Sequence, residues 1–294
     1  TGGSVVTDWV VEYSSDAGVS WTTFDDGTSV SASATVTGLT NGTAYVFRVS
    51  AVNAAGTGVA SANSASVTPY TTPGASTSVV ASPENSGAVV SWTAPDSGGS
   101  TITGYKVTAE PGGATCQTTD STSCIVVGLT NGTAYTFSVV ATNAAGDGPP
   151  AATSTAATVT PRTTPGAPTA VSGVGGNTQV TVSWTAPSND GGSAITGYTV
   201  TAAPGGATCQ TTALTSCIVV GLTNGTAYTF SVVATNAAGD GVGSAEPSAT
   251  PYTTPGAPTA VSGVGGNTQV ALSWTAGGTG GSAVTDWVVE YSSD

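Results

Sequence analysis

Residues Gly38–Tyr45 read Gly-Leu-Thr-Asn-Gly-Thr-Ala-Tyr, and the same eight residues return at Gly128–Tyr135 and Gly221–Tyr228. Each copy is followed by alternating apolar and polar residues, the pattern of a half-buried β-strand. Asn-Gly is the dipeptide that tight turns between strands favour. We therefore expect one strand to end at the leucine and a second strand to begin at the tyrosine. The tyrosine ring enters the core there, while its hydroxyl bonds to nearby backbone.

The spacing of these copies predicts several small domains. Asn41, Asn131 and Asn224 are 90 and 93 residues apart in a chain of 294 residues, which is one small β domain per period. No segment shows apolar residues at helical spacing over three turns, whereas alternating runs are frequent. The chain contains 41 glycines and 16 prolines, a composition that fits short strands joined by turns. The expected fold class is all-β.

Four segments follow from the repeat. Residues 1–70 are expected to form a sandwich that lacks its first strands, with a strand at Asp8–Ser14 and Trp21 in the next strand. Complete sandwiches are expected at 71–162 and 163–252, and residues 253–294 supply the opening strands of another. The linkers contain Thr-Pro-x-Thr-Thr-Pro-Gly. Since proline fixes φ and holds the preceding residue extended, these connections should be short and fairly stiff.

The end of the chain repeats its beginning. Residues 1–16 and 279–294 differ only at Val5 and Ala283, and no methionine is present, so the chain is expected to be part of a longer protein. In one version, a single polypeptide runs through many such units. In the other, residues 253–294 of one subunit complete the first sandwich of the next, as a donated strand does. The continuous chain is favoured, because the sixteen overlapping residues would be redundant in a donor.

The cysteines form two pairs with the same spacing. Cys116 and Cys124 are eight residues apart, as are Cys209 and Cys217. The chain has no histidine, and two thiols per domain cannot fill a tetrahedral metal site. Local disulfides are therefore predicted, each stapling a hairpin of neighbouring strands and contributing about 2–3 kcal/mol. Disulfides indicate an oxidising, extracellular setting.

Charge and composition exclude several classes of function. Three Lys and Arg residues stand against sixteen Asp and Glu, a net charge of −13, which disfavours nucleic acid and anionic lipid as partners. No apolar run is long enough to span a membrane. Without histidine, Ser-His and Cys-His catalysis is ruled out, and no catalytic residue, metal or cofactor is expected. Calcium is the weaker alternative at the loops Asp96–Gly99 and Asn189–Gly192, which offer oxygen ligands but fewer carboxylates than a calcium loop usually gathers.

Two sets of residues are candidates for contact or modification. Asn41, Asn131 and Asn224 each open Asn-Gly-Thr, an N-glycosylation acceptor pattern, although a tight corner favours the same residues. Trp92, Trp184 and Trp274 are expected in cores. The aromatic residues left to contact a neighbouring domain, another subunit or a glycan are Trp21, Tyr70 and Tyr252.

The motifs together resemble one family. A tryptophan in the second strand (Trp92, Trp184), a tyrosine in the third (Tyr105, Tyr198), the repeated corner and the Asn-Ala-Ala-Gly-x-Gly turn resemble fibronectin type III domains. The resemblance implies tandem seven-stranded β-sandwiches and no reaction of their own. Near-identical repeats are similar to those of long bacterial surface and secreted proteins. The family's Arg-Gly-Asp motif is absent, so its integrin-binding role does not carry over.

The first hypothesis for function is structural. The chain would be a non-catalytic repeat segment of an extracellular filament, sheath or stalk, with copies of itself as partners. The alternative is a spacer or carbohydrate-binding module in a secreted enzyme that degrades polysaccharide. A third hypothesis is an adhesin stalk that contacts surface glycans.

Overall fold

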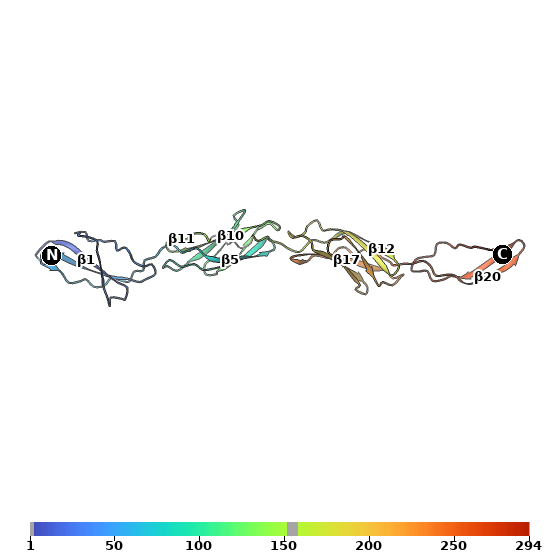
Figure 1. The fold of residues 1–294 in the computed structure, drawn as a ribbon, viewed down its shortest axis with the longest axis horizontal. Helices are drawn as coiled ribbons and strands as arrows, with labels where there is room; N and C mark the ends of the chain where they lie inside the picture. The colour runs from blue at the N-terminus through green and yellow to red at the C-terminus, as the bar shows by residue number, and fades with distance from the viewer. Residues whose placement is uncertain (1–2, 152–157, 294) are drawn as a thin grey trace. The chain divides into compact units, whose positions relative to one another are not determined.

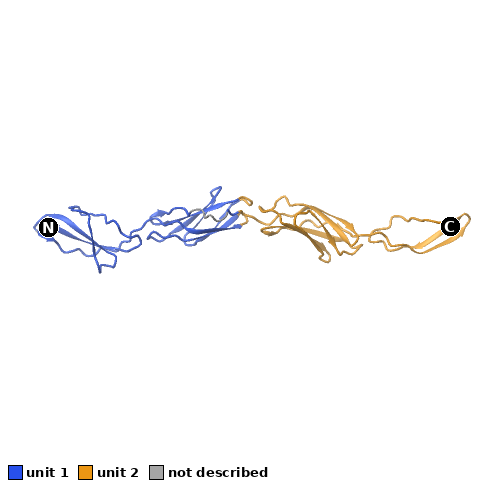
Figure 2. Ribbon diagram, viewed as in Figure 1, with its two compact units in different colours: residues 1–83, 87–129, 134–159 blue, residues 84–86, 130–133, 160–294 orange. Residues whose placement is uncertain are grey.

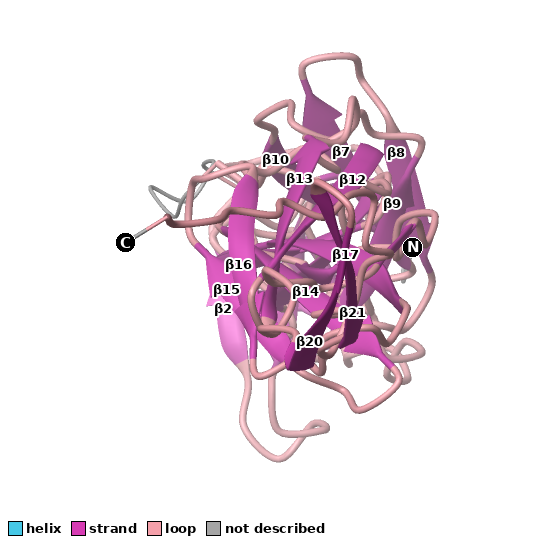
Figure 3. Cartoon of the chain, turned by 90° about the vertical axis from the view of Figure 1, so that its right-hand side faces the viewer, coloured by secondary structure: helices cyan, strands magenta, loops and turns pink. Residues whose placement is uncertain are grey.

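The computed structural model describes residues 3–151 and 158–293; Thr1, Gly2 and Asp294, at the ends of the recurring segment, lie outside that part. The described residues form strands and loops without a helix (Figure 3). Among them, accordingly, no helix suited to crossing a membrane is found. The chain divides into two compact units, shown in blue and orange in Figure 2. Unit 1 holds the residues up to 159 except for two short loops, residues 84–86 and 130–133, which belong with residues 160–294 in unit 2.

Sandwich 1, at the start of unit 1, consists of one antiparallel sheet. Its strands follow the order β2-β1-β3-β4, namely β1 (Val6–Ser14), β2 (Thr22–Phe24), β3 (Val46–Asn53) and β4 (Gly56–Thr57). Figure 1 labels β1 near the N-terminus. The strand predicted at Asp8–Ser14 lies within β1. Trp21, which was predicted to lie in the second strand, precedes β2 instead. No second sheet covers this one among the described residues.

Sandwich 2 completes unit 1 and has two facing sheets. One has the order β5-β6-β9, from β5 (Thr77–Glu84), β6 (Gly87–Thr93) and β9 (Ser123–Val127). The other has the order β11-β10-β7-β8, from β7 (Gly104–Glu110), β8 (Thr115–Thr118), β10 (Thr136–Asn143) and β11 (Gly146–Asp147). These seven strands match the number that the resemblance implies.

Sandwich 3, in unit 2, repeats this plan. The first sheet has the order β12-β13-β16, from β12 (Thr169–Gly176), β13 (Gln179–Thr185) and β16 (Ser216–Val220). The second has the order β15-β14-β17-β18, with β19 also paired to β17; its strands are β14 (Gly197–Ala203), β15 (Thr208–Thr211), β17 (Tyr228–Asn236), β18 (Gly239–Asp240) and β19 (Ser248–Ala249). The C-terminal hairpin consists of β20 (Thr259–Gly266) and β21 (Gln269–Thr275), which pair with each other and with no other strand of the described residues.

The cores of sandwiches 2 and 3 follow from strict alternation. Along β10 every second residue is buried, and Val139 is wholly so because it faces the opposite sheet. Trp92 packs against Tyr105 with ring centroids 5.2 Å apart, and Trp184 packs against Tyr198 at the same distance. The prediction that these two tryptophans lie in cores is therefore confirmed. Trp274 is only half-buried, since the hairpin that carries it has no facing sheet.

Candidate functional site

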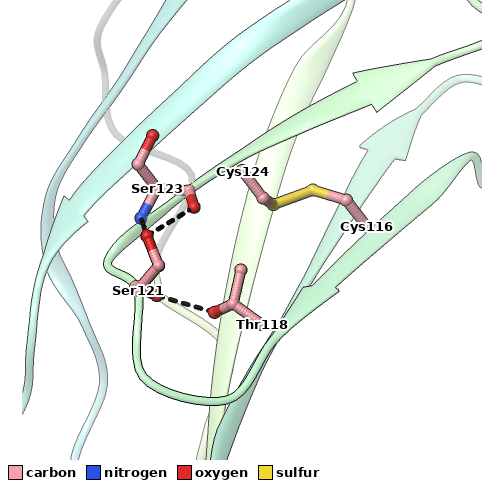
Figure 4. Close-up of a disulfide and its surroundings, with 5 residues drawn as sticks. All are labelled: Cys116, Thr118, Ser121, Ser123 and Cys124. Carbon is pink, nitrogen blue, oxygen red and sulfur yellow. Dashed lines mark hydrogen bonds between the residues drawn. A yellow bond between two sulfur atoms is a disulfide. The ribbon is translucent and has the colours of Figure 1, made fainter.

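Both predicted disulfides are present. Cys116 is bonded to Cys124, and Cys209 to Cys217, with Cα atoms 6.3 Å apart in each pair. The loop inside the first pair is closed by its own hydroxyls, since Thr118 donates a hydrogen bond to the carbonyl of Ser121 at 2.6 Å (Figure 4). The described residues contain no free cysteine.

The expected position of these disulfides was wrong in one respect. Cys116 lies on β8 and Cys124 on β9, two strands that are consecutive in the chain but belong to different sheets. Cys209 on β15 and Cys217 on β16 have the same relation. The bond therefore joins the two sheets of a sandwich rather than two strands of one hairpin. Each disulfide resists separation of the sheets at one edge of the core.

The tyrosine of the corner bonds as the sequence predicts. The hydroxyl of Tyr228 accepts a hydrogen bond from the backbone N–H of Thr223 at 3.1 Å, and Tyr45 accepts one from Thr40 at the same distance. Tyr228 is 8 % exposed, and its ring belongs to the core of sandwich 3. The corner is thus held by a backbone turn on one side and by packing on the other.

The corner asparagine has a role that sequence reasoning missed. The side-chain oxygen of Asn224 accepts a hydrogen bond from the N–H of Thr178 at 2.8 Å, and its Nδ2 donates to Asn177 Oδ1 at 2.9 Å. Asn131 makes the same two bonds to the turn between β5 and β6. A glycan on Nδ2 would compete with one of these bonds. Glycosylation of Asn41, Asn131 and Asn224 stays a prediction.

The corner also forms a joint with the loop that follows the linker. The N–H of Gly42 donates to the carbonyl of Pro69 at 2.9 Å, and a Cβ on Gly42 would stand 3.3 Å from the Cα of Gly99. Gly99 has φ +89°, and a Cβ on it would collide with the backbone of Gly42. Two backbones therefore lie in contact with no side chain between them.

The same joint occurs three times in the chain. In each joint the N–H of the corner glycine donates to the carbonyl of the linker proline at 2.9 Å. A Cβ on that glycine would stand 3.3 Å from the Cα of a glycine in the Gly-Gly turn. The pairs are Gly42 with Gly99, Gly132 with Gly192, and Gly225 with Gly281. The first pair lies within unit 1 and the other two lie within unit 2. Recurrence of one geometry indicates that the linker sequence specifies it.

The linkers that lead into sandwiches 2 and 3 are also held by a buried asparagine of the sandwich that follows. Asn236 Nδ2 donates to the carbonyls of Thr163 and Asp190, at 2.8 and 2.6 Å. In sandwich 2, Asn143 does the same with Thr71 and Ser97. Both asparagines are about 5 % exposed, so these bonds are shielded from water. These bonds hold the end of each linker against the sandwich that follows it.

The three aromatic residues expected at an interface have different surroundings. Trp21 contacts its own sandwich, with the Arg48 guanidinium 4.1 Å from its ring centroid. Tyr70 is 53 % exposed and Tyr252 is 47 % exposed. Tyr252 lies against Gly175, where a Cβ would stand 3.0 Å from the ring. An interface role for Trp21, Tyr70 and Tyr252 stays a prediction.

Sequence reasoning missed one cluster of hydrogen bonds in the turn between β1 and β2. The carboxylate of Asp16 accepts from the hydroxyls of Ser14 and Ser20, both at 2.6 Å, and from the N–H groups of Val19 and Ser20. These donors, the Ser14 hydroxyl first, hold the pKa of Asp16 well below its usual range. Beside it, the bond from Arg48 lowers the pKa of Glu12.

Sandwich 2 has a shallow hollow of about 600 Å³, and sandwich 3 has one of about 660 Å³ at the matching residues. The first is lined mostly by polar residues, among them Lys106 of β7, Gln117 of β8 and Asp147 of β11. Asp147 already accepts a hydrogen bond from Thr142 at 2.6 Å. No group of three or more His, Cys, Asp or Glu residues in the described ranges could hold a metal ion.

Comparison with known proteins agrees with this architecture. The family model of the fibronectin type III domain matches residues 1–67, 72–157 and 164–250. Endoglucanase B of Cellulomonas fimi is 37% identical over 235 residues, which are 73% of this chain and 22% of the endoglucanase. Exoglucanase B of the same species is 32% identical over 257 residues, 77% of this chain and 23% of the exoglucanase.

A third relative is chitinase A1 of Niallia circulans, which is 39% identical over 147 residues, 47% of this chain and 20% of the chitinase. The chain thus spans less than a quarter of the length of the curated relatives that it matches. Three matches to one family model, on strands that build β-sandwiches with the tyrosine corner, place this all-β chain in the fibronectin type III family.

Proposed function

We propose that this chain is a non-catalytic spacer in a secreted protein, and that its sandwiches hold the parts joined to them at a set separation. The observation that carries this is the joint. Three copies use the same backbone contact and the same hydrogen bond to the linker proline. A tether that only needed length would not require two glycine backbones to meet three times.

The relatives support a setting for this role. Their names are those of an endoglucanase, an exoglucanase and a chitinase, and the matched part is a minor share of each. We propose that this chain likewise belongs to an extracellular protein that works on a polysaccharide. The two disulfides support an oxidising location. Three basic residues leave few sites for trypsin-like proteases, an advantage for an exposed spacer.

The spacer role is tested by the width of a distance distribution. Spin labels on Lys106→Cys in sandwich 2 and Thr201→Cys in sandwich 3, both exposed positions, report the separation by pulsed electron spin resonance. A narrow distribution is expected. Gly192→Ala should broaden it, because the new Cβ would stand 2.7–2.8 Å from atoms of Asn131.

The matched control for this variant is Gly205→Ala. Gly205 also has a positive φ, +92° against +82° for Gly192, but a Cβ on it would meet nothing within 4 Å. It should therefore cost similar backbone strain and leave the distribution narrow. A broad distribution in the parent protein, or equal broadening by both variants, would contradict a spacer that depends on its joints.

A second candidate function is a repeat of an extracellular filament, sheath or stalk. The recurrence of residues 1–16 at 279–294 favours it, since repetition of a unit longer than one sandwich is what a repetitive filament requires. Electron microscopy of the native material separates the two: filaments favour this candidate, and dispersed particles favour the spacer. Binding of the isolated chain to insoluble cellulose or chitin would instead support a carbohydrate-binding module.

A further inference from the structure

Sandwich 1 has an open apolar face. Val49 on β3 is 40 % exposed, whereas the residues at the same place in the other sandwiches, Val139 and Val232, are 0 % exposed. Beside Val49 lies a cavity of about 340 Å³, lined also by Trp9, Val11, Phe47, Ala34 and Val36. In sandwiches 2 and 3 the first two strands fill this place.

The C-terminal hairpin has exposed apolar residues at positions that are buried in sandwich 3. Residues 253–270, which include β20 and the start of β21, repeat 163–180 without a change, yet Val270 is 61 % exposed where Val180 is buried completely. Leu272, at the place of the fully buried Val182, is 44 % exposed. The hairpin is the opening pair of strands of a sandwich and has no facing sheet among the described residues.

We propose that the C-terminal hairpin of one copy of this chain fills the open face of sandwich 1 in a second copy. The pairing is given by sandwich 3, where β13 lies antiparallel to β16 with Val180 opposite Val219 and Val182 opposite Cys217. By the same alignment, β21 pairs with residues 33–37 of the second copy. Residues 33–37 belong to no strand, so no β-ladder of sandwich 1 occupies this segment.

The side chains that would meet are matched in size. This register places Val270 opposite Val36 and Leu272 opposite Ala34. At the place of Leu272 and Ala34, sandwich 3 has Val182 and the disulfide-bonded Cys217. In the proposed pair the larger leucine faces the smaller alanine, so the volume gained on one strand is offset on the other.

The turn of the hairpin carries the partners that Asn41 lacks. In sandwiches 2 and 3 the corner asparagine bonds to the turn between the first two strands, as Asn224 does with Asn177 and Thr178. The turn between β20 and β21 has the same two residues, Asn267 and Thr268. Asn41 is exposed and has no such bond within the described ranges. Docking would supply both bonds.

Tyr70 provides a further match. In sandwich 3, Tyr252 lies over Gly175 of β12, where a Cβ would stand 3.0 Å from the ring. The corresponding glycine of the hairpin, Gly265, has nothing within 4 Å of a Cβ. Tyr70 occupies in the linker after sandwich 1 the place that Tyr252 has after sandwich 3. The exposed tyrosine and the uncovered glycine would meet in the docked form.

The overlapping residues do not stand in the way of docking. Residues 286–293 repeat 8–15 but form no strand, and Tyr291 is 96 % exposed. The ring of Trp287 packs against Trp274, with centroids 5.5 Å apart, as Tyr198 packs against Trp184 at 5.2 Å. On docking, Trp9 of the second copy would take the place of Trp287. In the docked form, residues 8–15 of the second copy would therefore replace residues 286–293 of the first.

This inference concerns self-association and goes beyond the spacer role. The same contacts would form if two copies followed one another in a longer polypeptide. The proposed partner of the open face is in both cases another copy of this sequence.

A disulfide between copies tests the register. Residues opposite each other in an antiparallel pair have Cα atoms about 4.5–5.5 Å apart, within the range that a disulfide spans. The full chain with Ala34→Cys and Leu272→Cys, oxidised and then alkylated, should give a ladder of multimers on non-reducing denaturing gels. Reduction should return the ladder to a single band.

The matched control is Ala34→Cys with Ala271→Cys. Ala271 is the neighbour of Leu272 on β21, so its side chain points to the other face of the strand and no ladder is expected. A monomer of increased mobility from the Leu272 pair would mean that the hairpin closes on its own chain. That result, an absent ladder, or equal ladders from both pairs would overturn the proposal.

Sedimentation equilibrium tests the association without cysteines. The parent chain should associate with rising concentration, and Leu272→Asp should weaken the association at least about tenfold, since a carboxylate would enter the core. The unfolding transitions of sandwiches 2 and 3, which do not contain Leu272, should be unchanged. A parent chain that stays monomeric at all concentrations would also overturn the proposal.

Discussion

The carboxylate of Asp16 is the most heavily bonded acid of the described residues, with two hydroxyls and two backbone N–H groups directed at it. These bonds favour the charged form, so folding lowers its pKa. The stabilisation is therefore present above the unperturbed value, about 3.9, and is lost as the pH falls through the lower folded value. The turn between β1 and β2 should weaken only in strong acid.

A carboxyl titration by NMR checks this prediction. The midpoint for Asp16 should lie below about 3.9, and Ser20→Ala, which removes a hydroxyl donor, should raise it. Ser15→Ala is the control, since Ser15 is exposed and makes no such bond to Asp16. A midpoint near the unperturbed value, or one that Ser15→Ala moves equally, would show that these bonds do not form in solution.

At this scale some residues could be predicted and others could not. The buried Trp184, the bonded Tyr228 and the paired Cys209 and Cys217 were predictable, because repetition of a motif assigns each a place in a strand. The contacts of Asp16 depend on how a loop folds back on one side chain. No pattern of residue types encodes that geometry.

At the scale of elements, each disulfide connects strands that belong to two separate sheets of a sandwich. Replacing Cys209 and Cys217 by alanine should lower the free energy of unfolding of sandwich 3 by about 2–3 kcal/mol, as expected for a closed loop of eight residues. Calorimetry should show one unfolding transition move to lower temperature. The transition of sandwich 2, which keeps its own disulfide, is the internal control.

Treatment with a reductant adds a second check. In the parent protein the reductant should lower the unfolding temperatures of sandwiches 2 and 3. In the variant it should lower only the unfolding temperature of sandwich 2. If reductant leaves the parent transitions in place, the disulfides contribute nothing to stability.

The strands themselves were largely predictable. The alternation of apolar and polar residues predicts the first residue of β10 and of β17 to within one residue. It does so because the side chains that point into the core must be apolar. The assignment of β8 and β9 to different sheets was not predictable in this way. A short connection is compatible with a hairpin and with a crossing between sheets, and only the pairing of β9 with β6 decides between them.

At the scale of the whole molecule, the net charge of −13 opposes association of copies. The C-terminal hairpin, residues 259–275, carries no charged residue, so the proposed docking gains no ion pair at its core. Added salt screens repulsion between copies, with a Debye length of about 10 Å at 0.1 M and about 3 Å at 1 M. Self-association should therefore strengthen as salt rises.

Sedimentation in 0.02 M and 0.5 M sodium chloride checks this prediction. The Leu272→Asp variant is the control, since its weak association should respond much less. Association that weakens with salt would indicate that ion pairs, and not the apolar faces, hold the copies together.

The joints between sandwiches consist of main chain, with two glycines in contact and a proline carbonyl as acceptor. Such a coupling does not depend on the side chains that distinguish one sandwich from another. A module that begins with the proline linker and Gly-Gly turn and ends with the Asn-Gly corner can be added, removed or reordered without redesign of its neighbours. The reach of the protein can thus change in whole modules by recombination between near-identical segments, while each coupling keeps its geometry.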